Sequence, residues 1–138
     1  MNIIKNTVLS IILLASYTAT ANVVVIVHPS NGVDFDQSSI SKLFLGKAKK
    51  FNDGNQAVPI NQEENSAARA SFNSSVLSKS GSQLKAYWSK LIFTGKGSPP
   101  KEVASDAEVI DLVSKNPNMI GYVDSESLTD AVKPVGTF

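Results

Sequence analysis

The stretch NVVVIVH, residues Asn22 to His28, decides the fold class of this chain. It is a continuous run of β-branched side chains without alternating polar positions, which is typical of a strand buried on both faces. The PSNG segment at 29–32 then predicts a turn. Strands buried on both faces are found in layered α/β domains, so the segments that follow decide whether this chain is one.

Helical and extended patterns alternate along the rest of the chain. Helices are predicted over 38–46, over 83–93, over 105–116 and from a cap at Asn65 or Ser66 onward; strands are predicted over 57–61, 119–123 and 131–138. Inward positions of the helices are Ala68, Phe72, Val76, Leu84, Trp88, Leu91, Ile92, Val109, Leu112 and Val113. Tyr87, Trp88 and Phe93 are expected in the core as well. The alternation predicts one α/β domain with a mainly parallel sheet flanked by helices.

Residues 1–21 have the order of a secretory signal. Lys5 precedes the apolar stretch VLSIILLA at 8–15, and the small residues Ala19, Thr20 and Ala21 follow it. The apolar part is too short to span a bilayer, and the alternative is a buried first helix or a retained anchor. We therefore expect a folded domain over 22–138 in the periplasm.

The composition argues against several functions. The chain carries 13 basic and 12 acidic residues, so it has no basic surface for nucleic acid, and no polybasic or amphipathic segment predicts membrane insertion of the domain. It has no cysteine and a single histidine, His28, and no metal-ligand spacing or serine nucleophile elbow occurs. We therefore predict no catalytic residue, no metal and no cofactor. His28 ends the first strand, where it could line a ligand site, although a lone histidine is more often structural.

The segment NQEENSAARASF, residues 61–72, contains the only arginine of the chain, Arg69. A helix that begins at Ser66 offers free backbone N–H groups and a partial positive charge to an anion. The Ser66 hydroxyl and the Arg69 guanidinium would add donors. The alternative is that Ser66 only caps the helix, while Arg69 pairs with Glu63, Glu64 or another surface acid. An acid such as Glu64 would repel a fully ionised ligand but can accept a hydrogen bond from one that keeps a proton, such as hydrogen phosphate.

Four stretches together resemble the phosphate-binding proteins of bacterial ABC importers. SISKLFLGKAKKFNDGNQAVPIN is similar to their L-x-x-IFLGK and W-x-D-G segment, and NSAARASF is similar to their Ser-Gly-Thr-Arg loop. YWSKLIFTGKGSPPKEV and NMIGYV resemble two later motifs, and all four occur in the family's order. The resemblance implies a periplasmic-binding-protein-like lobe. It also implies a phosphate site at Glu64, Ser66, Ala67, Ala68 and Arg69, with the two alanines acting through backbone N–H groups.

Three departures from the family weaken the expected site. Ala67 and Ala68 replace the glycine and threonine of the motif, which removes one hydroxyl donor, and Asn65 replaces a glycine. Loss of a donor to a charged ligand costs about 1.5–3 kcal/mol. Family members also have two lobes, whereas this chain resembles one. We therefore expect weak binding of phosphate or a similar oxyanion, with an importer, a sensor protein or a second copy as partner. A lobe that has lost its ligand and serves protein contacts is the alternative.

Overall fold

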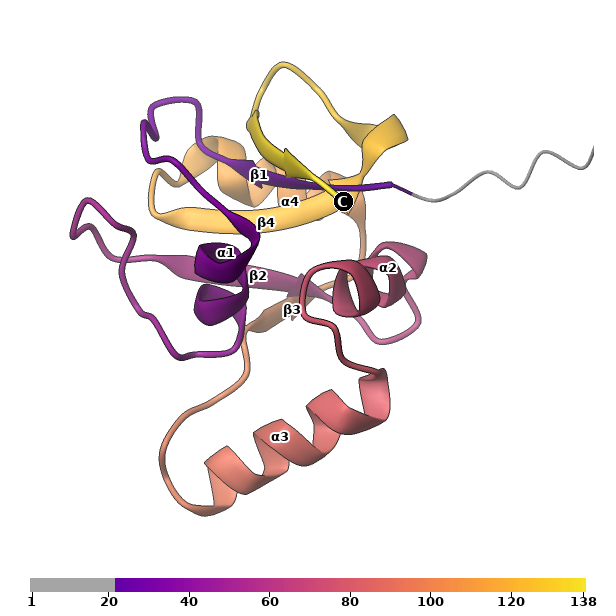
Figure 1. Ribbon diagram of the computed structural model, residues 1–138. Coiled ribbons are helices and arrows are strands. Elements are labelled where there is room, and N and C mark those ends of the chain that lie inside the picture. Colours follow the sequence, from indigo (N-terminus) through magenta and orange to yellow (C-terminus); the bar gives the residue numbers. More distant parts are fainter. Residues whose placement is uncertain (1–21) are drawn as a thin grey trace, which may run out of the picture.

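The computed structural model describes residues 22–138, so the predicted signal at 1–21 lies outside the described residues (Figure 1). The elements in chain order are β1 (Val23–Val27), α1 (Gln37–Phe44), β2 (Val58–Gln62), α2 (Ala67–Ser75), α3 (Gly81–Phe93), β3 (Lys101–Val103), α4 (Asp106–Lys115), β4 (Met119–Asp124), the short 3₁₀ helix η1 (Ser125–Ser127) and β5 (Lys133–Thr137). The sequence patterns predicted the four helices and four of these strands; the three-residue strand β3 was not predicted.

The strands form one sheet in the order β3-β2-β4-β1-β5. β2 runs parallel to β3 and to β4, whereas β1 runs antiparallel to β4 and to β5. β5 therefore points in the same direction as β4, and only β1 among the described strands is reversed. The predicted α/β class with a mainly parallel sheet and flanking helices is confirmed.

Helices cover both faces of the sheet (Figure 1). The side chains of β1 alternate between two cores, as expected of a run buried on both faces, and every residue of the strand is buried. Val23, Val25 and Val27 pack in the core beneath α1 and α2, whereas Val24 and Ile26 pack in the core beneath α4. The α2 prediction is also confirmed, because Ala68, Phe72 and Val76 are buried in the first of these cores.

Helix α3 differs from the other helices because it lies at one end of the molecule, away from the sheet (Figure 1). Leu84 is its only buried residue. The expected core positions Ile92 and Phe93 are instead 55% and 92% exposed. The prediction of both as core residues is wrong, because helical spacing identifies an apolar face but not whether another element covers it.

The contacts between α3 and the domain involve the segment that follows α1. The Tyr87 hydroxyl donates a hydrogen bond to the Leu45 carbonyl at 2.6 Å. Gly46 has a φ of 71°, and a Cβ atom at this position would lie 3.2 Å from the Trp88 ring. Gly46 is therefore required both by its left-handed backbone and by the approach of the indole.

Candidate functional site

The site begins at the carboxyl end of β2, where the chain turns into α2. Ser66 caps α2: its Oγ accepts a hydrogen bond from the Arg69 N–H at 3.2 Å and donates one to Gln62 Oε1 at 2.6 Å. Neither the Ala67 nor the Ala68 N–H has a protein acceptor within the described residues, and Ala67 is exposed. The start of α2 therefore leaves two backbone N–H groups without a protein acceptor, one of them on an exposed residue, as expected of a helix N-terminus.

Gln62 connects several elements at this end of the sheet, although sequence reasoning did not identify it. Its side chain is 2% exposed, and its Nε2 donates to Asp106 Oδ1 at 2.6 Å and to the Tyr122 carbonyl at 3.0 Å. Asp106 begins α4, and its Oδ2 accepts from the Asp124 N–H and from the Ser127 hydroxyl. A single amide thus joins β2, β4, α2 and α4. A polar residue that ends an apolar strand was the available signal, but its partners lie 44 and 60 residues along the chain.

Tyr122 closes the network from below. Its hydroxyl donates to Asn61 Oδ1 and accepts from the Gln62 N–H at 3.1 Å, while its ring stacks on Phe72 with centroids 4.0 Å apart. Burial of the phenol raises the pKa of Tyr122 well above its usual range, because the phenolate would lose its hydration. We refer to Gln62, Ser66, Asp106 and Tyr122 as the Gln62 network.

Arg69 makes protein contacts on one side of its guanidinium. Its Nη1 donates to the Gln62 carbonyl at 2.8 Å and to Glu102 Oε1 at 2.7 Å, and its side chain is 12% exposed. Glu102 lies in β3, the strand that was not predicted, and it is 43% exposed. The alternative considered for Arg69, an ion pair with a surface acid, is therefore observed, and the acid is neither Glu63 nor Glu64.

A hollow of about 240 Å³ adjoins the loop between α2 and the start of α3. Its lining residues are Glu64, Arg69, Asn73, Gly81, Ser82 and Lys85. Two of the five predicted site residues thus line it. Sequence reasoning did not identify Asn73, which lies in α2, or Lys85, which lies in α3. The Asn73 Oδ1 is buried and has no hydrogen-bond partner among the residues described.

His28 does not join this site. β1 runs against β4, so that Val23 pairs with Asp124 and Val27 pairs with Ile120. His28 therefore follows β1 at the end of the sheet opposite to Gln62. Its Nδ1 lies 2.7 Å from Ser30 Oγ there. A place for His28 in this site, which the sequence left open, does not fit the antiparallel direction of β1.

Over residues 22–138, no group of His, Cys, Asp or Glu is arranged to hold a metal ion. None of the helices in that range has the length and apolar character needed to cross a membrane. The hollow beside the start of α2 is lined by two cationic side chains, Arg69 and Lys85, and by one acid, Glu64, which suits an anion that keeps a proton.

Comparisons with known proteins give a consistent result at the level of structure only. No protein-family model and no curated protein matches the sequence. An ABC-type phosphate transport receptor from Vibrio cholerae superposes with a TM-score of 0.64 and 18% identity, over 83% of this chain and 46% of the receptor. A putative phosphate ABC transporter substrate-binding protein from Clostridium perfringens, solved with bound phosphate, gives 0.64 and 21% identity over 83% and 45%. PstS from Borrelia burgdorferi gives 0.62 and 16% over 84% and 47%.

The likeness shows the fold. This chain has the architecture of a lobe of phosphate ABC transporter substrate-binding proteins, as its sequence motifs predicted. It spans less than half the length of these structures.

Proposed function

We propose that this protein is a secreted solute-binding protein that binds phosphate or a similar oxyanion at the start of α2, in phosphate uptake or sensing. The observation that carries the proposal is that the backbone N–H groups of Ala67 and Ala68, at the N-terminus of α2 next to Arg69, have no protein acceptor within residues 22–138. The fold likeness to a protein solved with bound phosphate supports it.

The proposed binding is weak. Ala68 supplies no hydroxyl, and Arg69 already shares its Nη1 between a carbonyl and Glu102. No second lobe lies in the described chain to exclude water from the ligand, so water competes for each donor. We expect micromolar to millimolar affinity for phosphate in the isolated domain, and tighter binding where an importer, a sensor protein or a second copy covers the loop.

Calorimetric titration of the domain with phosphate and with sulfate tests the proposal. Arg69→Ala is expected to remove saturable phosphate binding, whereas Lys115→Ala, which removes a cation paired with Asp111 near the opposite end of α4 from Asp106, is expected to leave it unchanged. Absence of heat up to tens of millimolar phosphate would reject the site in the isolated domain.

Two further substitutions separate the roles of the loop residues. Ala67→Ser adds a hydroxyl donor at the exposed first position of α2 and is expected to strengthen phosphate binding by about tenfold. Glu64→Gln is expected to raise the affinity for sulfate relative to phosphate, because only phosphate offers a proton to the carboxylate. An unchanged ratio would remove Glu64 from the site.

The second candidate is a lobe without a ligand that serves protein contacts. The ion pair between Arg69 and Glu102 favours it, because the pair gives the arginine a structural role. Arg69→Ala would then lower the free energy of unfolding without any change in phosphate binding.

A further inference from the structure

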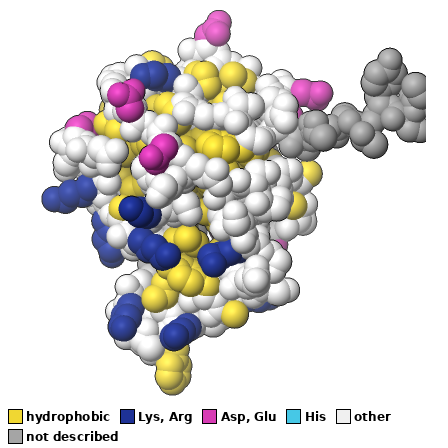
Figure 2. Space-filling model, viewed as in Figure 1, with side chains coloured by type: hydrophobic (Ala, Val, Ile, Leu, Met, Phe, Trp, Pro, Cys, Tyr) yellow, Lys and Arg dark blue, Asp and Glu magenta, His cyan; other side chains and the backbone are white. Residues whose placement is uncertain are grey.

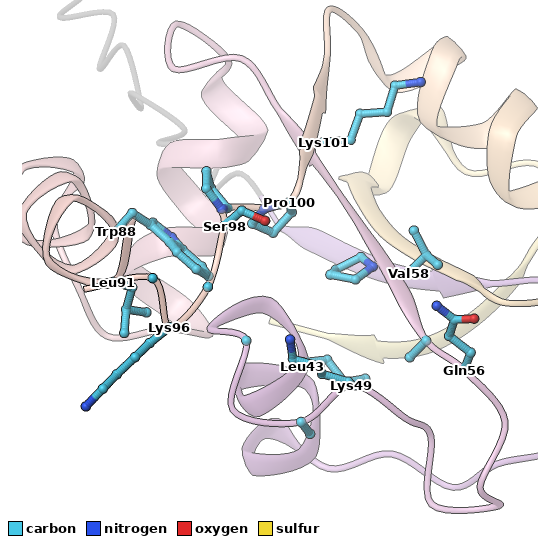
Figure 3. A pocket seen from close by; sticks show the side chains of 17 residues that line it. Leu43, Lys49, Gln56, Val58, Trp88, Leu91, Lys96, Ser98, Pro100 and Lys101 are labelled. Atoms are coloured by element: carbon cyan, nitrogen blue, oxygen red, sulfur yellow. The ribbon is translucent and has the colours of Figure 1, made fainter. Parts of the chain in front are cut away.

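We propose that the groove between α3 and the body of the domain docks an acidic segment of another protein that also carries apolar side chains. The groove has a volume of about 450 Å³, and Figure 3 shows it between α3 and the segments around β2. It is separate from the hollow lined by Glu64 and Arg69, and no residue lines both sites. This inference does not depend on phosphate binding.

The wall of the groove is apolar and aromatic. In Figure 3, the Trp88 indole lies close to Ser98 and Pro100 on one side of the opening, while Leu43 lies across from it. Leu91 lines the groove from the next turn of α3. A concave apolar surface of this size accepts side chains from a partner chain, as in helix-in-groove and extended-peptide recognition.

The rim of the groove is cationic. Of the residues that the structure describes around it, three are lysines (Lys49, Lys96 and Lys101) and none is Asp or Glu. All three side chains are exposed, and none takes part in an ion pair within residues 22–138. The whole sequence is close to neutral, so this grouping is a local feature. Figure 2 shows the same segregation: Lys and Arg side chains gather around hydrophobic atoms on the half that carries α3, while most visible Asp and Glu side chains lie on the other half.

The apolar surface continues beyond the groove at the end of α3. Ile92 and Phe93 follow Leu91 directly and are 55% and 92% exposed. Single exposed apolar residues are ordinary, but these two end the helix that forms one wall of an apolar, aromatic groove, and exposed apolar side chains next to such a groove are typical of interfaces. Aromatic side chains of this kind are enriched among residues that contribute most to binding.

Charge and shape together identify the occupant. Lys49, Lys96 and Lys101 line the groove without any acid, although Lys101 also borders a neighbouring hollow that contains Glu102, Glu108 and Asp111. Unpaired lysines on this rim favour a partner that carries carboxylates, and they would repel a basic one. A bilayer is also anionic, but its surface cannot enter a concave groove walled by Trp88, whereas a leucine or tryptophan side chain can. We infer an Asp- and Glu-rich segment that places one or two apolar side chains in the groove.

Fluorescence anisotropy with designed peptides tests the inference on the folded domain. The probe is a labelled peptide in which Asp and Glu alternate with Leu and Trp. One control peptide replaces its acids with Lys, and another replaces its apolar residues with Ser. Only the first peptide is expected to bind, with a dissociation constant of tens to hundreds of micromolar that rises with salt.

Matched variants place the binding on the protein. The triple substitution K49Q/K96Q/K101Q is expected to weaken binding about tenfold, whereas K79Q/K115Q/K133Q, which removes the same charge outside the groove, is expected to change it less than about twofold. Ile92→Ser/Phe93→Ser tests the apolar half and is expected to weaken binding about fivefold or more. Amide resonance shifts on peptide addition are expected at Lys49 and over 91–97.

Four outcomes would overturn the inference. The first is equal binding of the acidic and basic peptides, and the second is equal loss in the two lysine triples. The third is absence of binding by the acidic, apolar peptide up to millimolar concentration. The fourth is lysine-dependent retention on phosphatidylglycerol vesicles without peptide binding, which would assign the patch to a membrane surface instead.

Discussion

The Gln62 network and helix α3 differ in which side chains they bury and which they expose. In the Gln62 network, polar side chains lie in buried or half-buried positions and hydrogen-bond to one another inside the protein. In α3, apolar side chains are exposed and few contacts hold the helix to the domain. The hydrogen bonds of the Gln62 network fix the positions of its side chains, at a cost in desolvation, whereas α3 keeps apolar surface available for a binding partner. The free energy of unfolding should therefore respond strongly to changes in the Gln62 network and weakly to changes along α3.

The largest expected effect comes from removing the amide at the centre of the Gln62 network. Gln62→Leu leaves Asp106 Oδ1 and the buried Tyr122 carbonyl without their shared donor, at a position that is itself 2% exposed. We expect a loss of about 3 kcal/mol in the free energy of unfolding, measured by urea denaturation. Gln56→Leu makes the same chemical change at an exposed position and should cost less than about 0.5 kcal/mol. Equal effects of the two would mean that the network is not a stabilising unit.

A smaller effect is expected where α3 meets the domain. Gly46→Ala forces a left-handed residue to carry a Cβ and also places that atom against Trp88, whereas Gly54→Ala has the same backbone problem with open space around it. We expect losses of about 2 and about 1 kcal/mol. Trp88 is the only tryptophan, so the tryptophan fluorescence of the protein comes from this side chain. The emission should shift in Gly46→Ala and stay unchanged in Gly54→Ala; a shift in both would show that Trp88 senses the whole domain.

Alkaline pH should lower the free energy of unfolding through Tyr122 of the Gln62 network. Burial raises the pKa of Tyr122 above its ordinary value of 10.0, so the unfolded chain ionises first. The stability from this group is fully present below pH 10 and is lost as the pH rises further, by up to about 1.4 kcal/mol per pH unit. Tyr122→Phe keeps the stack on Phe72 but should start less stable and lose less between about pH 10 and pH 11, by urea denaturation. The same slope in both proteins would assign the alkaline transition to other groups.

The sequence predicted the elements better than their partners. The run at 23–27 predicted burial on both faces, which is correct. A run of β-branched residues gives no information on strand direction, so the end of the sheet at which His28 lies could not be predicted. The position of Ser66 as a helix cap followed from local chemistry and is confirmed. Glu102, Asp106 and Lys85 could not be placed near it, because tertiary packing brings them from segments that local patterns treat separately.

The smallest expected effect is the most informative about α3. Helical spacing placed Phe93 in a core, and a core phenylalanine costs about 3–5 kcal/mol when truncated. Its side chain is 92% exposed, so Phe93→Ser should change the free energy of unfolding by less than about 0.5 kcal/mol, whereas Phe72→Ala, at a 1% exposed position, should cost the full amount. Urea denaturation of both variants measures the contrast. A large loss in Phe93→Ser would mean that the end of α3 packs on the domain in solution, and the exposed patch proposed as a docking surface would not exist.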